Sequence, residues 1–554
     1  RMEQRVYAGS SGSDSGRPPA GGGLRRRPRR RTSSAGSDST LFALAESTRV
    51  AWERVRALYA RDAATRTADL SAVRQGYRFI DPLASETVTN ALTALLAAFL
   101  LYQLVAARRE LLRFLQQLGP ESVELALVAL LLLAVRVAYG LHKHRRVLCV
   151  DFVTYKPPPR LYTSTEKFLE LSRQAGVFDD EEIEFQRKVL DRSGLGDRTS
   201  FPEAMHRAEE IALAGGNGAA VLNMYNARLE AEQVMFSSLD ELFARNELDA
   251  RCDVDILIVN CSLFNPTPSL SAMIVNRYRM KPSVRTYNLS GMGCSAGVIA
   301  VDLAKDLLQA HRNVRCVIVS TENITQNWYL GKQKSMLLSN TLFRLGCAAV
   351  LLSNRAADAS RARFELHTVV RTHSGSDDQA YDSVFQMEDS AGIRGVKLSK
   401  NIMDIAGNSL KTNITTLAPL VLPLSEHLKF GLYVLRKRLM RAGVLAHQKL
   451  PPFVPDFHLA FRHFCIHTGG RGVLDVMEDA LALSAEDMAP SRFVLHRFGN
   501  VSSASIWYEL EYVERSGRMR RGDRVWQIAF GSGFKCNSAV WRALVSNSQR
   551  DVDY

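Results

Sequence analysis

The stretch that decides the fold is VRTYNLSGMGCSAGVIAVDLAKDLLQAH, residues 284–311. It opens with β-branched and aromatic residues typical of a strand, and it closes with apolar residues at helical spacing from Val298 to Leu307. Glycines surround Cys294 in the turn between the two patterns. A strand that passes through a tight turn into a helix predicts one unit of an α/β fold, with the helix beginning near Cys294 or Ser295.

The same alternation of strands and helices extends over most of the chain after residue 151. Sheets built this way are covered by helices on both faces, and the order of elements in the first half resembles the order in the second. The sequence similarity between the halves is too weak to prove a repeat. Further strand candidates lie at 253–260, 314–321, 347–354, 363–373, 457–467 and 523–533, and helix candidates lie at 477–484 and 502–513.

The composition fits a folded protein with a large core, because 46% of the 554 residues are hydrophobic and 23% are charged. The net charge of +14 owes much to basic runs such as Arg25–Arg31, and no zinc-finger or other nucleic-acid signature accompanies it. We therefore expect no nucleic-acid partner. The eight cysteines are scattered without CxxC pairs, which indicates a reducing compartment and argues against a disulfide scaffold.

The N-terminal region divides into two parts. Residues 1–40 are rich in Gly, Ser, Pro and Arg and are expected to form a disordered tail, although an Arg- and Ser-rich start also fits an organelle transit peptide. Residues 41–150 are expected to be helical, with two apolar stretches, 88–107 and 123–141, each long enough to cross a bilayer. We expect a transmembrane hairpin, and the alternative is a buried helical pair. More Lys and Arg residues lie outside the short link than within it, which favours a body in the cytosol.

Two interpretations of Cys294 follow from its surroundings. As a free cysteine it could be a small apolar side chain packed in a tight turn. At a helix N-terminus, unpaired N–H groups and the helix dipole would instead lower its pKa and favour the nucleophilic thiolate. Gly291, Gly293 and Gly297 would permit the sharp turn and the close approach of a substrate. The residues alone leave both interpretations open.

Two histidines near residue 465 are candidate partners for a nucleophile. His463 and His467 are four residues apart, a spacing that suggests a metal site on a helix. The surrounding run is strand-like, however, and at about 3.3 Å per residue the two would be roughly 13 Å apart, so we expect no metal site. His467 lies at the end of the predicted strand, whereas His463 is expected to have a structural or supporting role.

Two later segments could stabilise a developing negative charge. Asn500 is either a helix N-cap or a side-chain amide that donates a hydrogen bond to an oxyanion. Gly531, Ser532 and Gly533 form either a β-turn or a glycine loop that brings backbone N–H groups close to an acyl carbonyl.

Together these segments resemble the condensing enzymes of the thiolase-like superfamily, and most of all the plant- and alga-type 3-ketoacyl-CoA synthases that elongate very-long-chain fatty acids. The resemblance runs from about Asp151 to Leu544. The family's nucleophile, histidine and asparagine fall on Cys294, His467 and Asn500. Its motifs occur here in one order: YNLSGMGCSAG, VSTENITQNWYLG, AGNSLKTNITTLAPLVLPLSE, HFCIHTGGR, LHRFGNVSSASIWYEL and RVWQIAFGSGFKCNSAVW.

The resemblance implies a five-layer αβαβα body of two similar halves, 151–360 and 361–554, behind the N-terminal hairpin. It implies that Cys294 takes the acyl group of a long-chain acyl-CoA while the glycine loop holds the oxyanion. His467 and Asn500 would then stabilise the enolate that forms when malonyl-CoA loses CO2. The product would be a 3-ketoacyl-CoA, formed in the first step of elongation without a metal or other cofactor.

Further expectations concern the surroundings of this site. His373, His463 and His496 are candidates for supporting residues that orient the catalytic groups. The resemblance also implies a homodimer in the endoplasmic reticulum membrane, with its body facing the cytosol, working with the reductase and dehydratase of the elongation cycle. Two alternatives remain: a polyketide-type condensing enzyme and a non-catalytic scaffold subunit of an elongation complex.

Overall fold

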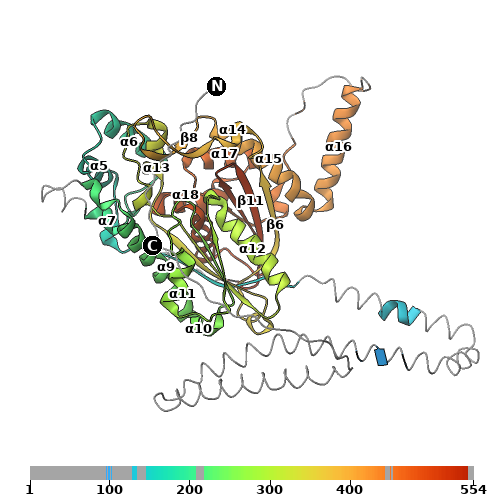
Figure 1. The fold of residues 1–554 in the computed structure, drawn as a ribbon. Coiled ribbons are helices and arrows are strands. Elements are labelled where there is room, and N and C mark those ends of the chain that lie inside the picture. Colours follow the sequence, from blue (N-terminus) through green and yellow to red (C-terminus); the bar gives the residue numbers. More distant parts are fainter. Residues whose placement is uncertain are drawn as a thin grey trace, which may run out of the picture. The chain divides into compact units, whose positions relative to one another are not determined.

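The computed structural model describes residues 145–207, 218–442, 444, 450 and 453–546, together with helical positions at 95, 98, 99, 102 and 128–133 (Figure 1). The chain divides into two compact units, Arg1–Ser85 and Glu86–Tyr554, and every described residue belongs to the second. The predicted tail at 1–40 therefore lies outside the described residues.

The two predicted membrane spans, 88–107 and 123–141, lie outside the described residues except at the helical positions given above. Apolar side chains at these positions are exposed, among them Leu95 (66%) and Leu131 (63%). Within the described part of the chain, no helix combines the length and the apolar character needed to cross a bilayer.

Nine strands form one mixed sheet whose two halves have the same strand order, read outward from the middle, apart from β3, which has no counterpart in the described part of the second half. The first half runs β1-β5-β4-β2-β3 and the second runs β6-β11-β10-β9, and they meet where β1 pairs with β6. The strands are β1 (Leu148–Thr154), β2 (Ile256–Asn260), β3 (Arg285–Leu289), β4 (Arg315–Thr321), β5 (Cys347–Ser353), β6 (Phe364–His373), β9 (His463–Ile466), β10 (Arg524–Gly531) and β11 (Lys535–Ala543).

The pairing directions repeat as well. In the first half β2 is parallel to β4, and β5 is antiparallel to both β4 and β1. In the second half β9 is parallel to β10, and β11 is antiparallel to both β10 and β6. The expected similarity of the two halves is therefore confirmed at the level of topology, where sequence similarity was too weak to show it.

Helices lie in three layers around the two half-sheets. α9 (Met224–Arg245) and α11 (Leu270–Tyr278) pack on the outer face of the first half, and α15 (Ile402–Val421) and α17 (Arg471–Leu481) cover the outer face of the second. α12 (Ala296–Ala310) and α19 (Ser505–Arg515) lie between the halves and contact strands of both. α12 is apolar around most of its circumference, as expected for a helix buried between two sheets.

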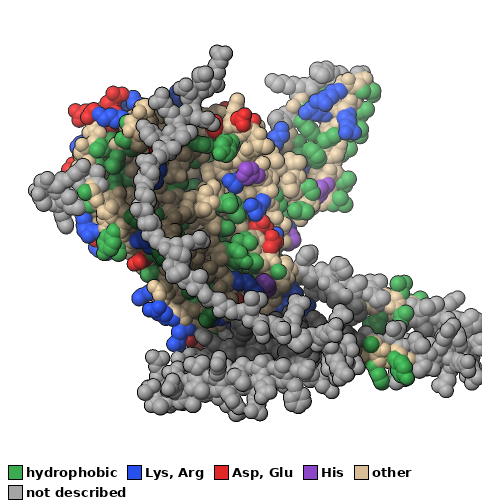
Figure 2. All heavy atoms as spheres, in the orientation of Figure 1, with side chains coloured by type: hydrophobic (Ala, Val, Ile, Leu, Met, Phe, Trp, Pro, Cys, Tyr) green, Lys and Arg blue, Asp and Glu red, His purple; other side chains and the backbone are tan. Residues whose placement is uncertain are grey.

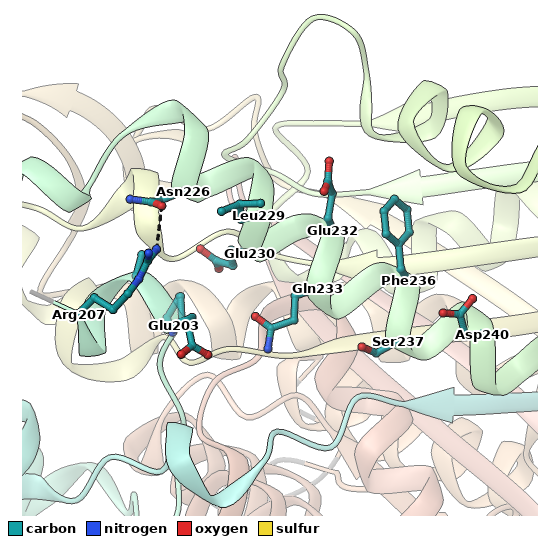
Figure 3. Close-up of a pocket in the computed structure, with 12 residues that line it drawn as sticks. Glu203, Arg207, Asn226, Leu229, Glu230, Glu232, Gln233, Phe236, Ser237 and Asp240 are labelled. Atoms are coloured by element: carbon teal, nitrogen blue, oxygen red, sulfur yellow. Dashed lines mark hydrogen bonds between the residues drawn. The ribbon is translucent and has the colours of Figure 1, made fainter.

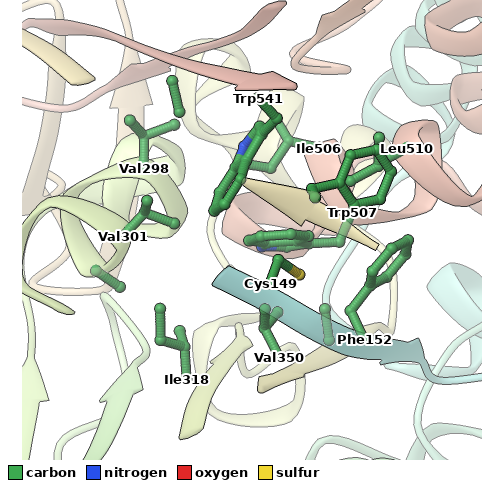
Figure 4. Packing of buried hydrophobic residues seen from close by; sticks show 14 of the residues in the cluster. Cys149, Phe152, Val298, Val301, Ile318, Val350, Ile506, Trp507, Leu510 and Trp541 are labelled. Atoms are coloured by element: carbon green, nitrogen blue, oxygen red, sulfur yellow. The ribbon is translucent and has the colours of Figure 1, made fainter. Parts of the chain in front are cut away.

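The central core joins the layers (Figure 4). Trp507 of α19 stacks on Phe152 of β1, with ring centroids 5.6 Å apart, and on Trp541 of β11, at 6.0 Å. All three rings are almost completely buried. These contacts fix the two half-sheets relative to the central helices, and therefore fix the loops that carry the candidate site.

The remaining described elements surround this body. They are α5 (Thr165–Gln174), α6 (Asp180–Ser193), α7 (Glu203–His206), α10 (Ala250–Asp253), α13 (Lys334–Leu342), α14 (Asp378–Tyr381), α16 (Leu424–Arg441), α18 (Ala485–Phe498), the hairpin β7 (Val384–Glu388) and β8 (Arg394–Leu398), and the short 3-10 helices η1 to η7.

Two predicted strands are shorter than expected, for local reasons. The run 253–260 becomes a strand only from Ile256, because Asp249 caps the short helix α10 ahead of it. The run 457–467 becomes a strand only from His463, because Asp456 caps a 3-10 turn at Phe457–Leu459. Capping residues thus convert the starts of apolar runs into helical turns.

Candidate active site

The turn that carries Cys294 is built on glycine. Gly291 and Gly293 have φ angles of +64° and +67°, which favour glycine. A Cβ atom on Gly293 would also overlap the backbone N of Ser532. Cys294 lies in the 3-10 turn Gly293–Ser295 (η3), and α12 begins only at Ala296, two residues later than the earliest expected start. As a whole residue Cys294 is partly exposed, whereas the other seven cysteines are buried.

The predicted glycine loop packs directly on this turn. It connects β10 to β11, and Ser532 Oγ donates to Gly291 O at 3.5 Å. A Cβ atom on Gly531 would overlap Ser295 Oγ and Met292 O. The structure therefore brings Gly531 and Ser532 against the Cys294 turn, and the loop lines the candidate site.

Ser502 links Cys294 to Asn500. Its hydroxyl lies 3.5 Å from Cys294 Sγ and 3.3 Å from Glu322 Oε2, and its backbone N–H donates to Asn500 Oδ1 at 2.9 Å. Ser502 has a φ of +55°, so the backbone is held in a conformation that few non-glycine residues adopt. The segment after Asn500 thus places a hydroxyl group beside the thiol.

Asn500 is buried and is held at three atoms. Its N–H donates to Leu342 O at 3.2 Å, its carbonyl accepts from Arg344 N at 2.9 Å, and its side-chain oxygen accepts from Ser502. The amide oxygen therefore accepts a hydrogen bond within the turn, but Asn500 is not a helix N-cap, because the N-caps of the 3-10 turn Ser502–Ala504 and of α19 are Val501 and Ala504. The NH2 group of the same amide is left as the donor that an oxyanion needs.

His467 follows β9 directly and is buried. The backbone N–H of His467 donates to Ile528 O at 2.9 Å. The hydroxyl of the next residue, Thr468, donates to Gly499 O at 3.2 Å. His467 and Asn500 thus lie on loops that are bonded to each other. His467 Nδ1 is buried without a hydrogen-bond partner among the described residues. Burial lowers the pKa of His467 to about 4, so the imidazole is neutral at pH 7.

The expected lowering of the Cys294 pKa is wrong. Burial raises the pKa of the thiol to about 12, although the hydrogen bond from Ser502 opposes this change. The nearby carboxylate of Glu322 raises the pKa further. Because burial outweighs the hydrogen bonds that favour the thiolate, the free thiol is protonated at pH 7.

The three histidines expected to support the site lie in different parts of the structure. His373 ends β6 beside the glycine loop, where a Cβ atom on Gly375 would overlap its ring. His463 starts β9 at the far end from His467, and its Nε2 lies 3.2 Å from Asp523 Oδ2. His496 lies in α18, with its ring against Gly196. Only His373 therefore borders the candidate site.

The sequence analysis missed Glu322 and Ser502. Glu322 follows the end of β4 and is buried, and it accepts hydrogen bonds from the N–H groups of Ser262 and Leu263 and from the thiol of Cys261. Burial raises the pKa of Glu322. Its place after a buried strand, where active-site residues collect in α/β folds, was the available signal. Ser502 had no such signal, because the serines around it are equally small and polar.

One cavity of about 430 Å³ lies along α7 and α9 (Figure 3). Four carboxyl groups line it, together with Arg207, which donates to Asn226 Oδ1 at 3.1 Å. None of Cys294, His467 and Asn500 contributes to its wall. An acidic lining disfavours anionic ligands, so this cavity is suited to neutral or cationic molecules and is separate from the candidate site.

A much smaller cavity, about 20 Å³, shares Glu322 with the site. Its wall is largely apolar and includes Leu263, Trp328, Phe343 and Val396. Phe343 also pairs with Asn500 in an isolated β-bridge. This cavity therefore adjoins the candidate site, because Glu322 and Phe343 belong to its wall and also contact residues of the site.

The fold places the protein in a structural class, that of the type III polyketide synthases. The structure of 1,3,6,8-tetrahydroxynaphthalene synthase from Streptomyces coelicolor A3(2), a bacterial type III polyketide synthase, aligns with a TM-score of 0.53 at 20% identity, over 72% of this chain and 100% of that one. The C-terminal type III polyketide synthase domain of Steely1 from Dictyostelium aligns with a TM-score of 0.56 at 15% identity and the same coverage. At these identities the alignments show the shared fold alone.

Sequence comparison narrows the class to a family. Residues 139–439 match the model described as FAE1/Type III polyketide synthase-like protein, and residues 460–543 match the 3-oxoacyl-[acyl-carrier-protein] synthase III C-terminal model. 3-Ketoacyl-CoA synthase 4 of Arabidopsis thaliana is 57% identical over 406 residues, which are 73% of this chain and 75% of the relative. 3-Ketoacyl-CoA synthase 2 of the same plant is 49% identical over 480 residues, 86% and 87% of the two chains. The chain belongs to the 3-ketoacyl-CoA synthases, a family of condensing acyltransferases, as the motifs predicted.

Proposed function

We propose that the protein condenses a long-chain acyl-CoA with malonyl-CoA, with loss of CO2 and CoA, as the first step of very-long-chain fatty acid elongation. One observation carries the proposal: Ser502 bonds to both Cys294 and Asn500 while the glycine loop packs on the same turn. A thiol, an amide donor and backbone N–H groups in one place are the parts that acyl transfer requires.

In the first half-reaction, Cys294 Sγ forms a bond to the acyl carbon, and the carbon–sulfur bond to CoA breaks. CoA leaves as a thiolate that takes up the proton released by the Cys294 thiol. Because the pKa of this thiol is raised to about 12, the proton leaves during the attack and not before it. The Ser502 hydroxyl stabilises the sulfur as negative charge develops, and N–H groups of Cys294 and the glycine loop bind the oxyanion.

In the second half-reaction, malonyl-CoA loses CO2 and leaves an enolate. His467 and Asn500 donate hydrogen bonds to its thioester oxygen. A neutral imidazole suits this role, because an N–H donor stabilises the enolate without neutralising it into an unreactive enol. The carbanion then attacks the acyl carbon on Cys294, the carbon–sulfur bond breaks, and the Cys294 thiolate takes a proton from water as a 3-ketoacyl-CoA is released. The proposed steps need no metal or other cofactor, because the substrates and water supply every atom and electron pair that is transferred.

The acyl chain would enter the apolar cavity beside Glu322. Its present volume of about 20 Å³ holds no more than a water molecule, so Phe343 or Trp328 would have to move when a substrate binds. Replacing Val396 with Trp should then shorten the longest product without abolishing acylation of Cys294 by short acyl-CoA. Product analysis by mass spectrometry checks this, and an unchanged chain-length profile would assign the acyl chain to another path.

The direct experiment compares Cys294→Ala with a control, Cys252→Ala, in microsomes supplied with labelled malonyl-CoA and a long-chain acyl-CoA. Cys252 lies in the short helix α10, outside the site. We expect no condensation by the first variant and near-normal condensation by the second. Normal product formation by Cys294→Ala would refute the proposed nucleophile. A wild-type protein that forms no acyl-thioester would favour a non-catalytic scaffold, and products of repeated condensation would favour a polyketide-type enzyme.

We also propose that the protein resides in the endoplasmic reticulum membrane with its body facing the cytosol. The apolar stretches 88–107 and 123–141 support this, since each is long enough to span a bilayer. Because its product needs reduction and dehydration before the next round, the reductase and dehydratase of the cycle are proposed partners. Resistance to an alkaline carbonate wash and a reticular pattern of the tagged protein are expected. Release into the soluble fraction, or a plastid pattern, would contradict the assignment.

A homodimer is proposed on the basis of β3. Among the described residues this strand is at the edge of the sheet and pairs only with β2, and it has no buried residue along its length. An uncovered edge strand next to the Cys294 turn is suited to pair with a second copy. Analytical ultracentrifugation in detergent should show a dimer, and a monomer at micromolar concentration would contradict this.

A further inference from the structure

Helix α16 exposes a stripe of leucines. Leu424, Leu428, Leu432 and Leu435 are 72%, 60%, 66% and 51% exposed. Their spacings of four, four and three residues place them on one face of the helix, with the half-buried Leu439 continuing the same face. A soluble helix normally turns such a face towards the core, so this face needs a partner.

The described part of the body contacts α16 from other sides. Phe430 and Tyr433 stack on Phe453, with ring centroids 5.6 and 5.7 Å apart. Glu426 accepts a hydrogen bond from the N–H of Asp456 at 3.2 Å. These residues lie away from the leucine face on the helical wheel, so the contacts that α16 makes with Phe453 and Asp456 leave the leucines outward.

The charges of α16 are almost all positive. The helix has one acidic residue, Glu426, which is buried and pairs with Lys429 at 2.6 Å. Figure 2 shows basic and hydrophobic side chains side by side over this helix. The basic residues are Lys429, Arg436, Lys437, Arg438 and Arg441.

We propose that α16 lies on the surface of an anionic lipid bilayer, with the leucine face among the acyl chains and the basic residues at the headgroups. An apolar stripe flanked by Lys and Arg is the pattern of helices that lie in a membrane interface. Charge complementarity selects this occupant over a second copy, because two such helices packed face to face would bring ten basic side chains together. The contact does not depend on the two predicted membrane spans, and it would place the body against the source of its lipid substrate.

The test measures amide hydrogen exchange of α16 in the full-length protein. The protein is placed in nanodiscs of phosphatidylcholine alone, or with about one-third phosphatidylserine. We expect exchange across Leu428–Leu435 to be slowed about fivefold or more by phosphatidylserine, and the slowing to be lost in about 0.5 M salt. α6, whose exposed face carries several acidic residues, is the internal control and should exchange equally in both discs.

Two variants separate lipid contact from other causes. Leu428→Glu with Leu432→Glu removes the apolar face, and Lys437→Glu with Arg438→Glu reverses the charge while keeping the leucines. Both should abolish the slowing caused by phosphatidylserine while the condensation rate with a detergent-dispersed acyl-CoA stays within about twofold of wild type. Exchange that is the same in all lipids would overturn the proposal. Protection that instead rises with protein concentration and ignores the lipid would also overturn it, by assigning the face to a second copy.

Discussion

At the scale of single residues, one hydroxyl group separates the Cys294 thiol from the buried carboxylate of Glu322. Ser502 Oγ lies within 3.5 Å of both side chains. Because it has one proton, it can donate either to the sulfur or to the carboxylate, and the choice depends on which of them carries the charge. A thiol whose pKa is raised to about 12 needs this donor at the moment that its proton leaves.

Ser502→Ala should therefore slow acyl transfer to Cys294 about tenfold, since a hydrogen bond to a developing charge contributes ~1.5 kcal/mol. The rate of acyl-enzyme formation from labelled acyl-CoA measures the effect. Ser502→Gly is the matched control, because it also lacks the hydroxyl but relieves the φ of +55°. Both variants should be slow, and only Ser502→Ala should lose stability. Normal acylation by both would remove Ser502 from the mechanism.

The raised pKa of Cys294 predicts its reactivity towards iodoacetamide. Only the thiolate reacts, and its fraction rises about tenfold per pH unit below the pKa, so alkylation should accelerate without a plateau between about pH 7 and pH 9. Mass spectrometry of the peptide that contains Cys294 gives the rate, with Cys294→Ala as the blank. A plateau below about pH 8 would show a preformed thiolate and restore the expectation based on the helix dipole.

The lowered pKa of His467 predicts the acid limit of malonyl-CoA decarboxylation. The imidazole stays neutral until the pH approaches about 4, so the decarboxylation half-reaction should persist as the pH falls through 6.5, the ordinary histidine value. For the same reason the unfolded chain binds a proton at higher pH than the native chain. The contribution of His467 to stability is therefore present above pH 6.5 and is lost as the pH falls towards about 4. Loss of decarboxylation with a midpoint near 6.5 would contradict the buried, neutral histidine, and His458→Gln, at an exposed position beside Asp487, is the control.

At the scale of elements, the strand–turn–helix unit at 284–311 was predictable because two periodicities and a cluster of glycines agree. The unit forms as β3, η3 and α12, and the strand candidates at 314–321 and 347–354 form as β4 and β5. The elements that differ are α10 and the 3-10 turn Phe457–Leu459 (η6). They depend on single capping residues, Asp249 and Asp456, whose effect outweighs the apolar pattern after them. Periodicity thus predicts which element forms, and local side-chain capping decides where it starts.

Glycine substitutions test how the Cys294 turn is held. Gly293→Ala should lower the free energy of unfolding by ~1–3 kcal/mol, since alanine disfavours a φ of +67° and its Cβ would overlap Ser532. Acylation should also fall, because the same contact positions the glycine loop. Gly407→Ala in α15, where a Cβ meets nothing within 4 Å, should stabilise the protein by ~0.5–1 kcal/mol. Thermal unfolding compares the two, and equal effects would argue against a constrained turn.

At the scale of the whole molecule, the candidate site is a product of the repeated topology. Cys294 begins the turn into α12 of the first half, and Asn500 precedes the turn Ser502–Ala504 (η7) into α19 of the second. The two central helices pack between the half-sheets, so their N-terminal turns meet. The motifs in the sequence predicted the residues of this site. They did not predict the raised pKa of Cys294, because the segments that bury the thiol and the Glu322 side chain near it are far apart in the chain.

The most direct measurement of the central claim is mass spectrometry of the protein after incubation with a long-chain acyl-CoA in the absence of malonyl-CoA. The account predicts one acyl group per chain, attached as a thioester to the peptide that contains Cys294 and released when malonyl-CoA is added. An acyl group on any other residue, or a protein that condenses both substrates while Cys294 stays unmodified at every time point, would contradict it.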